Sequence, residues 1–346
     1  MQGRLHLPLS YHEILSPRET ERAILKIKDA FQTNLAFELN LTRVTAPLFV
    51  ESGTGVNDDL NGVERPVTFT MPGVGNRQAE IVQSLAKWKR LALADLGFSS
   101  GEGLYADMNA VRPDEVPDST HSLYVDQWDW EVAIDPADRT VEFLVDMAQR
   151  IYDIIRRTER YICHEYEGLR AYLPSRITVL HSQELLDRYP DLTPRERERE
   201  AALEHGAVFV VGIGGRLSDG SIHDGRAPDY DDWITETASD RCGLNGDIVV
   251  YNRVLDEAFE LSSMGIRVVP DSLRRQLDLN GMADRLQLDF HRRLMAGELP
   301  ASIGGGIGQS RLCMLYLQKA HIGEIQASIW PAEMRETCGQ HGIRLL

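Results

Sequence analysis

The sequence predicts a single α/β domain. Segments with helical spacing alternate along the chain with short apolar segments typical of strands. No internal repeat, low-complexity segment or linker divides the 346 residues. Hydrophobic residues make up 42% of the chain, which is enough for a sizeable buried core. We therefore expect residues 1–346 to fold as one domain.

The clearest predicted helix begins after Ser16. Ser16 can cap it, Pro17 suits the first helical position, and Glu19 can complete a capping box. Apolar residues then recur at helical spacing, at Ile24, Ile27, Phe31 and Leu35. We expect the helix to end near Asn40, followed by an extended segment over residues 42–50 that bends at Pro47.

The rest of the chain follows the same alternation. A polar, Gly-rich loop is expected over residues 52–62, and a helix break at Gly281. Helices are predicted over 84–96, 141–166, from the Thr193 capping signature onward, 273–296 and 310–317, and strands over 123–134, 207–211, 247–251 and 265–269. The strand at 207–211 is apolar throughout, as a strand buried on both faces would be. These patterns alone allow a parallel sheet.

Charge and cysteine content exclude several classes of protein. The chain carries 37 Lys and Arg against 53 Asp and Glu, a net charge of −16, and has no basic run, so we expect no nucleic-acid partner. Four cysteines without CxxC spacing argue against a zinc site or a disulfide framework and suit the cytoplasm. The N-terminal residues do not resemble a secretory signal, and the most apolar run, 207–213, is too short to span a bilayer.

Residues 303–312, IGGGIGQSRL, form the first candidate site. Glycines at 304, 305, 306 and 308 allow positive φ and close approach of a ligand, and the following helix offers free amides. Arg311 in its first turn could stack on a flat ring or pair with phosphate. The run is not a Walker A motif, because no GK[ST] follows. A simple turn before a helix remains an alternative.

Residues 123–131 carry polar groups at alternate positions. Gln127, Asp129 and Glu131 should share one face of a strand, opposite bulky aromatic residues. This face is either half-exposed to solvent or the floor of an active site. Arg112 precedes it within a predicted turn, at 112–115.

Two further segments have both a structural and a functional interpretation. Residues 259–267, FELSSMGIR, offer Glu260, small polar groups and Arg267, or form a tight turn between a helix and a strand. In residues 84–90, SLAKWKR, the basic cluster is either a solvated helix face or part of a binding site. His223 and Asp224 lack a second histidine at i+3 or i+4, so a zinc site there is not expected.

Taken together, these motifs resemble the aspartate–ammonia ligases, the ammonia-dependent asparagine synthetases of bacteria. The matching runs are long and specific: QSLAKWKR (83–90), GEGLY (101–105), RPDE (112–115), YVDQWDWE (124–131), RAPDYDDW (226–233), GLNGDI (243–248), AFELSSMGIRV (258–268) and GGGIGQSRL (304–312). The resemblance implies a catalytic core like that of class II aminoacyl-tRNA synthetases. Such a core has a mostly antiparallel sheet flanked by helices, in a homodimer formed through the first helix and the Pro47 segment.

The implied reaction is ATP-dependent amidation of L-aspartate by ammonia, with ATP as co-substrate, Mg²⁺ as cofactor and β-aspartyl-AMP as intermediate. The products are L-asparagine, AMP and pyrophosphate. No membrane partner is implied. Two alternatives are an aspartyl- or asparaginyl-tRNA synthetase, which would need an anticodon-binding domain, and a catalytically silent paralogue that senses an amino acid.

The resemblance also implies roles for individual residues. Catalytic roles fall to Lys89, Arg112 and Asp231; aspartate binding to Asp58, Ser84, Lys89, Gln127, Asp129 and Ser263; nucleotide binding to Arg112, Asp247, Ser262, Arg267 and Arg311; and metal binding to Asp247 and Glu260. Arg112 matches the position that grips the α-phosphate, and Arg311 the position that stacks on adenine.

Overall fold

The computed structural model describes residues 5–8, 11–58, 60 and 64–346. Its strands are β1 (Leu41–Arg43), β2 (Phe49–Glu51), β3 (Thr68–Met71), β4 (Arg77–Ile81), β5 (Gly103–Val111), β6 (Tyr124–Ala133), β7 (Thr178–His181), β8 (Ala207–Val211), β9 (Glu236–Ala238), β10 (Arg241–Cys242), β11 (Asn245–Asn252), β12 (Glu257–Ile266) and β13 (Ser302–Gly308). Its helices are α1 (Pro17–Leu39), α2 (Ala86–Asp95), α3 (Val141–Glu165), α4 (Ser182–Arg188), α5 (Pro194–His205), α6 (Pro270–Leu279), α7 (Asp289–Met295), α8 (Gln309–Tyr316) and α9 (Ala332–Gln340).

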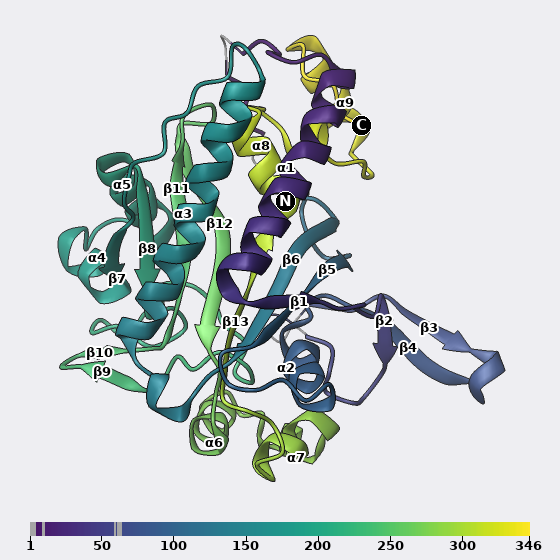
Figure 1. Cartoon of the computed structure of the whole chain (residues 1–346), viewed down its shortest axis with the longest axis vertical. Helices are drawn as coiled ribbons and strands as arrows, with labels where there is room; N and C mark the ends of the chain where they lie inside the picture. The colour runs from purple at the N-terminus through teal and green to yellow at the C-terminus, as the bar shows by residue number, and fades with distance from the viewer. Residues whose placement is uncertain (1–4, 9–10, 59, 61–63) are drawn as a thin grey trace.

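The centre of the molecule is an eight-stranded sheet in the order β1-β5-β6-β13-β12-β11-β8-β7 (Figure 1). The outermost pairs, β1–β5 and β7–β8, are parallel, and the pairs between them are antiparallel. The expected α/β class with a mostly antiparallel sheet is therefore confirmed. The parallel sheet that the residue patterns also allowed does not form.

One face of the sheet is covered by α1 and α3, which run side by side across it (Figure 1). The capping box that begins α1 is formed as predicted, with Glu19 accepting from the backbone N–H and the hydroxyl of Ser16. The buried stripe of α1 reaches Phe31, whose ring stacks on Trp128 of β6 at 4.6 Å between centroids. Helix α3 adds a second apolar stripe, so this face forms the main core.

The opposite face is covered only towards its edges. Helix α2 packs over β5 and β6, and α5 packs over β8, β11 and β12. The capping box at Thr193 begins α5 as predicted. Between these two helices the middle of the sheet, on β6, β13 and β12, keeps an uncovered polar surface. The candidate site lies there.

Two predictions for the middle of the sheet were wrong. In the segment 259–267 a tight turn was one interpretation, but residues 259–266 lie on β12, which begins at Glu257 instead of the predicted 265. Residues 303–308, interpreted as a Gly-rich turn, form β13, and none of its glycines has positive φ. Strand β5 was not predicted. In all three segments pairing with neighbouring strands outweighs a composition poor in β-branched residues.

Several other expectations are confirmed. The helical region after residue 270 is interrupted at Gly281, which has φ +66°, so that α6 and α7 are separate helices. The extended segment around Pro47 forms β1 and β2. Part of the loop expected at 52–62 lies outside the described residues. No helix in the described ranges is both long and apolar enough to cross a bilayer.

Substitution of a β13 glycine tests how closely the side chains of the sheet pack around this strand. A Cβ at Gly304 would lie 1.8 Å from Glu131 Oε2 and 2.5 Å from Arg267 Nη2. Gly304→Ala should therefore lower the free energy of unfolding by about 2 kcal/mol, because two buried charged groups must shift. Urea denaturation measures this. The control is Gly73→Ala, where a Cβ meets nothing within 4 Å. Equal stability of both variants would contradict the predicted close packing.

Candidate active site

A cavity of about 460 Å³ opens over the polar middle of the sheet. Its floor comes from β6, β13 and β12, and its walls from α2 and the loops around residues 58, 112 and 226–231. Eleven of the thirteen site residues implied by the sequence line it: Asp58, Ser84, Lys89, Arg112, Gln127, Asp129, Asp231, Glu260, Ser263, Arg267 and Arg311. Asp247 and Ser262 do not line it.

The floor consists of polar side chains on one strand facing glycines on the next. Gln127, Asp129 and Glu131 of β6 pair with Gly308, Gly306 and Gly304 of β13. A Cβ at Gly306 would lie 2.3 Å from Gln127 Oε1, so the glycine leaves room for the amide to lie across the strand. The polar groups of β6 therefore lie flat on the sheet, and this arrangement matches the floor interpretation rather than the half-exposed strand.

Lys89 enters the floor from α2. Its ammonium contacts a carboxylate oxygen of Asp129 and donates to the carbonyl of Gly305 at 2.9 Å. The side chain is only 1% exposed. Burial lowers the pKa of Lys89, although the charge of Asp129 opposes this shift. Lys89 is therefore a buried cation fixed at the cavity floor, not part of a solvated helix face.

Arg267 connects two acidic residues beneath the cavity. Its guanidinium donates to both oxygens of Glu131 and forms an ion pair with Asp231. Ser302 adds a hydrogen bond to Glu131 at 2.7 Å. Burial raises the pKa of Glu131, but Arg267 and Lys89 outweigh it and lower the pKa below its usual value. Arg267 is 2% exposed, and each of its three nitrogens already donates to a carboxylate oxygen.

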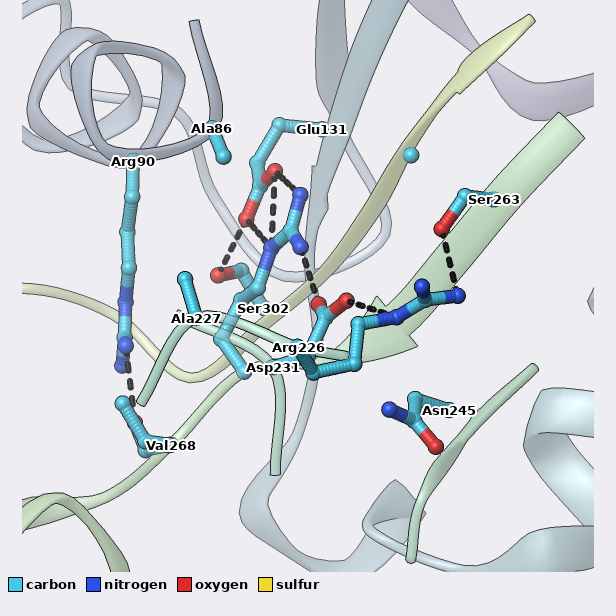
Figure 2. Close-up of polar contacts among 12 residues, drawn as sticks. Ala86, Arg90, Glu131, Arg226, Ala227, Asp231, Asn245, Ser263, Val268 and Ser302 are labelled. Atoms are coloured by element: carbon cyan, nitrogen blue, oxygen red, sulfur yellow. Dashed lines mark hydrogen bonds and ion pairs between the residues drawn. The ribbon is translucent and has the colours of Figure 1, made fainter. Parts of the chain in front are cut away.

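Arg226 occupies the neighbouring wall, as Figure 2 shows. It donates to the hydroxyl of Ser263 at 2.9 Å, forms an ion pair with Asp247 and lies 4.0 Å from Asp231. Burial raises the pKa of Asp247 to about 7, against the opposing effect of Arg226. Sequence reasoning did not select Arg226 or Glu131 as site residues, although both lie in quoted motifs, RAPDYDDW and YVDQWDWE.

Two half-buried arginines, Arg112 and Arg311, also line the cavity. Arg311 donates to the carbonyl of Glu260 at 2.9 Å and lies 5.7 Å from the ring centroid of Phe259. Arg112 donates to the carbonyl of Gln83 at 3.3 Å, and its Nε is buried without a partner among the described residues. The turn expected at 112–115 is present, closed by a hydrogen bond from Glu115 to Arg112. Both guanidiniums therefore retain donor groups for an anionic ligand.

The other residues that the resemblance assigned to the site make contacts with neighbouring parts of the fold. Ser84 accepts from the N–H of Ala86 at 3.1 Å where α2 begins, and Asp58 accepts from the N–H of Leu60 at 3.1 Å. Ser262 pairs with Ile307 and Ile248 on neighbouring strands and is 1% exposed. The structure thus places Ser262 away from the cavity, while Asp58 and Ser84 stand in its wall.

The donor set for a metal ion is limited. Within the described part of the chain no three His, Cys, Asp or Glu side chains gather as a metal site. Asp247 and Glu260 are near enough for the charge of Glu260 to raise the pKa of Asp247. Two carboxylates fit Mg²⁺, because this ion usually takes one or two protein carboxylates together with substrate phosphates and water.

A family profile described as aspartate-ammonia ligase matches residues 18–342, almost the whole chain. This chain belongs to the aspartate–ammonia ligase family. Relatives with that name include those of Parabacteroides distasonis, 55% identical over 98% of both chains, and Clostridium perfringens, 53% identical over 99% of both. A third, from Ruminiclostridium cellulolyticum, is 56% identical over 98% of both chains.

Solved structures place the ligase chain in the class II aminoacyl-tRNA synthetase fold. The asparaginyl-tRNA synthetase of Entamoeba histolytica matches with a TM-score of 0.65 and 14% identity, over 90% of this chain and 67% of that one. The asparaginyl-tRNA synthetase of Pyrococcus horikoshii, complexed with asparaginyl-adenylate, matches with a TM-score of 0.64 and 17% identity, over 90% and 70%. The fold implied by the sequence motifs is thus confirmed.

The buried pair of Glu131 and Arg267 predicts a pH-dependent stability effect in this ligase. Glu131→Gln should lower the free energy of unfolding by about 3 kcal/mol near neutral pH, because Arg267 loses a buried counter-charge. The pKa of Glu131 is lower in the folded state than in the unfolded state. Its contribution is therefore fully present above about pH 4.3, the usual carboxyl value, and is lost as the pH falls through the folded value.

Urea titrations of both proteins at pH 7 and at pH 3 measure this effect. Asp95→Asn is the control, because Asp95 pairs with Arg293 on the surface with 58% of its side chain exposed. That change should alter stability by no more than about 0.5 kcal/mol. A Glu131→Gln effect as small as the control would mean that the buried pair contributes nothing.

Proposed function

We propose that the protein catalyses ATP-dependent amidation of L-aspartate by ammonia to L-asparagine, releasing AMP and pyrophosphate through β-aspartyl-AMP. The observation that carries this proposal is the cavity itself. It brings together a buried cation, Lys89, beside carboxylates on its floor and two half-buried arginines, Arg112 and Arg311, in a chain of the aspartate–ammonia ligase family.

Charge neutralisation is the first requirement of this reaction. The β-carboxylate of aspartate must attack the α-phosphate of ATP, and both groups are anionic. Arg112 and Lys89 lower that repulsion and stabilise the charge that spreads over the phosphate as the bond forms. Arg311 stacks on the adenine, for which its planar guanidinium is suited.

The floor supplies the recognition of aspartate. Lys89 binds a carboxylate, while Asp58, Asp129 and Asp231 offer acceptors for the α-ammonium. Ser84, Gln127 and Ser263 contribute neutral hydrogen bonds. Arg267 acts through Asp231, because each of its nitrogens already donates to Glu131 or Asp231. We assign it to positioning rather than to the phosphate contact expected from the sequence.

Mg²⁺ is part of the proposal. Glu260 in the cavity wall would hold it, together with Asp247, which lies near Glu260 but does not itself line the cavity, and the ion would supply positive charge next to the phosphates. Ser262, which the sequence assigned to the nucleotide, is more consistent with packing of β12 because its hydroxyl does not line the cavity.

The oligomeric state and the cellular location are also proposals. We infer a homodimer through α1, whose outer surface presents Leu25 and Phe37, 62% and 89% exposed. The acidic chain and scattered cysteines suit a cytoplasmic enzyme without a nucleic-acid or membrane partner.

Product analysis without tRNA tests the proposed reaction. The pure protein with aspartate, ATP, magnesium and ammonium should form asparagine, AMP and pyrophosphate in equal amounts. ADP and phosphate would overturn the adenylate route. Aspartate and ATP binding without asparagine formation would favour a silent paralogue, and a requirement for tRNA would favour a tRNA synthetase.

Lys89→Met tests the role of the buried cation. It should reduce aspartate-dependent exchange of pyrophosphate into ATP at least about 100-fold, because the charge next to the reacting groups is lost. Arg112→Met is a companion variant at a less buried cation of the cavity and should show a loss of the same order. Circular dichroism and gel filtration check that each variant is folded. Near-normal exchange in a folded Lys89→Met protein would disprove the assignment.

A further inference from the structure

A second cavity, of about 270 Å³, lies next to the candidate active site. The segment 51–58, the strand β4 and helices α2 and α7 contribute to its wall. Asp58 lines both cavities, so its side chain belongs to the wall between them. A small reactant in the second cavity would therefore be one side chain away from the aspartate site.

The wall of the second cavity carries an excess of negative charge. Four carboxylates line it, against two permanent cations: Glu51, Asp58, Glu80 and Asp229 against Lys87 and Arg285. Both of these cations are held by one oxygen of Asp229, Lys87 at 3.2 Å and Arg285 at 3.1 Å. Glu51 is paired with a third cation, Arg77, at 2.7 Å, so the four carboxylates still exceed the three cations by one negative charge that can attract a cation from solvent.

Two buried polar atoms in this wall have no hydrogen-bond partner within the described chain. They are Oδ1 of Asp229 and Nδ1 of His291, on side chains that are both 0% exposed. The second polar atom of each side chain faces the other residue, with His291 Nε2 3.0 Å from Asp229 Oδ2. If Nε2 donates in this contact, Nδ1 carries a lone pair.

The neighbouring loop keeps room for the imidazole. Gly55 has φ +75°, and a Cβ there would lie 3.1 Å from His291 Nδ1 and 2.8 Å from Leu288 Cβ. Only glycine fits this conformation and this space without strain. A buried acceptor left without a donor destabilises the fold, so the retention of two such atoms side by side needs an explanation.

We propose that the second cavity admits and binds ammonium, with Asp229 and His291 as acceptors for its N–H groups. This inference rests on the proposed amidation, which consumes ammonia while ATP and aspartate fill the larger cavity. Ammonium carries one positive charge and only donors, and so complements a small acidic cavity with unpaired acceptors. Asp58 then separates the bound ammonium from the aspartate site.

Glu80→Gln is the primary test. It removes one charge from the wall and keeps an oxygen for Asn57, which donates to Glu80 at 3.1 Å. The KM for ammonium chloride should rise about fivefold, because one attractive charge is lost. Aspartate-dependent pyrophosphate exchange should not change, since it needs no ammonium. Glu204→Gln, at an exposed position of α5, is the matched control with the same change of charge.

His291→Gln is the second variant, and His164→Gln, at an exposed position of α3, is its control. Glutamine can keep a donor to Asp229 but lacks an acceptor at the Nδ1 position. The KM for ammonium should rise here too, with pyrophosphate exchange retained. Hydroxylamine, which is largely uncharged at neutral pH, should be used by both variants as well as by the wild type.

The outcomes separate the two proposals. An unchanged KM for ammonium in both variants, or an equal rise for hydroxylamine, would overturn ammonium binding in this cavity. If the variants lose both pyrophosphate exchange and stability, Asp229 and His291 have a structural role. That result would likewise overturn ammonium binding in this cavity. No aspartate-dependent exchange in the wild type would instead refute the proposed function.

Discussion

The structure depends on one interaction, the buried ion pairs of Arg267 with Glu131 and Asp231. A guanidinium removed from water must be matched by acceptors on every side, or its desolvation is not offset. This requirement brings together three segments that are distant in sequence: β6 supplies Glu131, β12 leads into Arg267, and the 226–233 loop supplies Asp231. Strand β13 passes between β6 and β12, and its glycine at 304 leaves the space in which these side chains meet.

The same sheet supports two different environments. On one face, Trp128 and Trp130 of β6 are packed beneath α1 and α3 in the main core. On the other, the alternate residues of the same strand line the cavity. Because successive residues of a strand point to opposite faces, a rigid apolar layer lies directly behind the polar floor. The charged groups are thereby held in place by packing that never touches a ligand.

Local signals in the sequence predicted much of this arrangement. The capping boxes at Ser16 and Thr193, the apolar run of β8 and the alternation on β6 each act over a few residues, and each is found in the structure. The strands β12 and β13 could not be predicted in this way, because serines and glycines favour turns until neighbouring strands pair with them.

For the site, motif resemblance selected eleven residues that line the cavity but missed two of their partners, Arg226 and Glu131. The pairing of Arg226 with Asp247 joins a loop to β11 and depends on the folded sheet. Likewise, nothing near Arg267 in the sequence indicates that carboxylates occupy its donors. Long-range partners of this kind decide whether an arginine is available to a ligand, so sequence alone could not separate Arg267 from Arg112 or Arg311.

The glycines of β13 have a consequence for the evolution of the protein. A Cβ at Gly304, Gly305 or Gly306 would approach neighbouring atoms closer than 2.6 Å. These positions therefore have almost no neutral substitutions, whereas the exposed helices around them can change freely. In related sequences, substitutions should therefore accumulate in the surrounding helices and spare these three glycines, because a side chain there would displace buried atoms of the neighbouring strands.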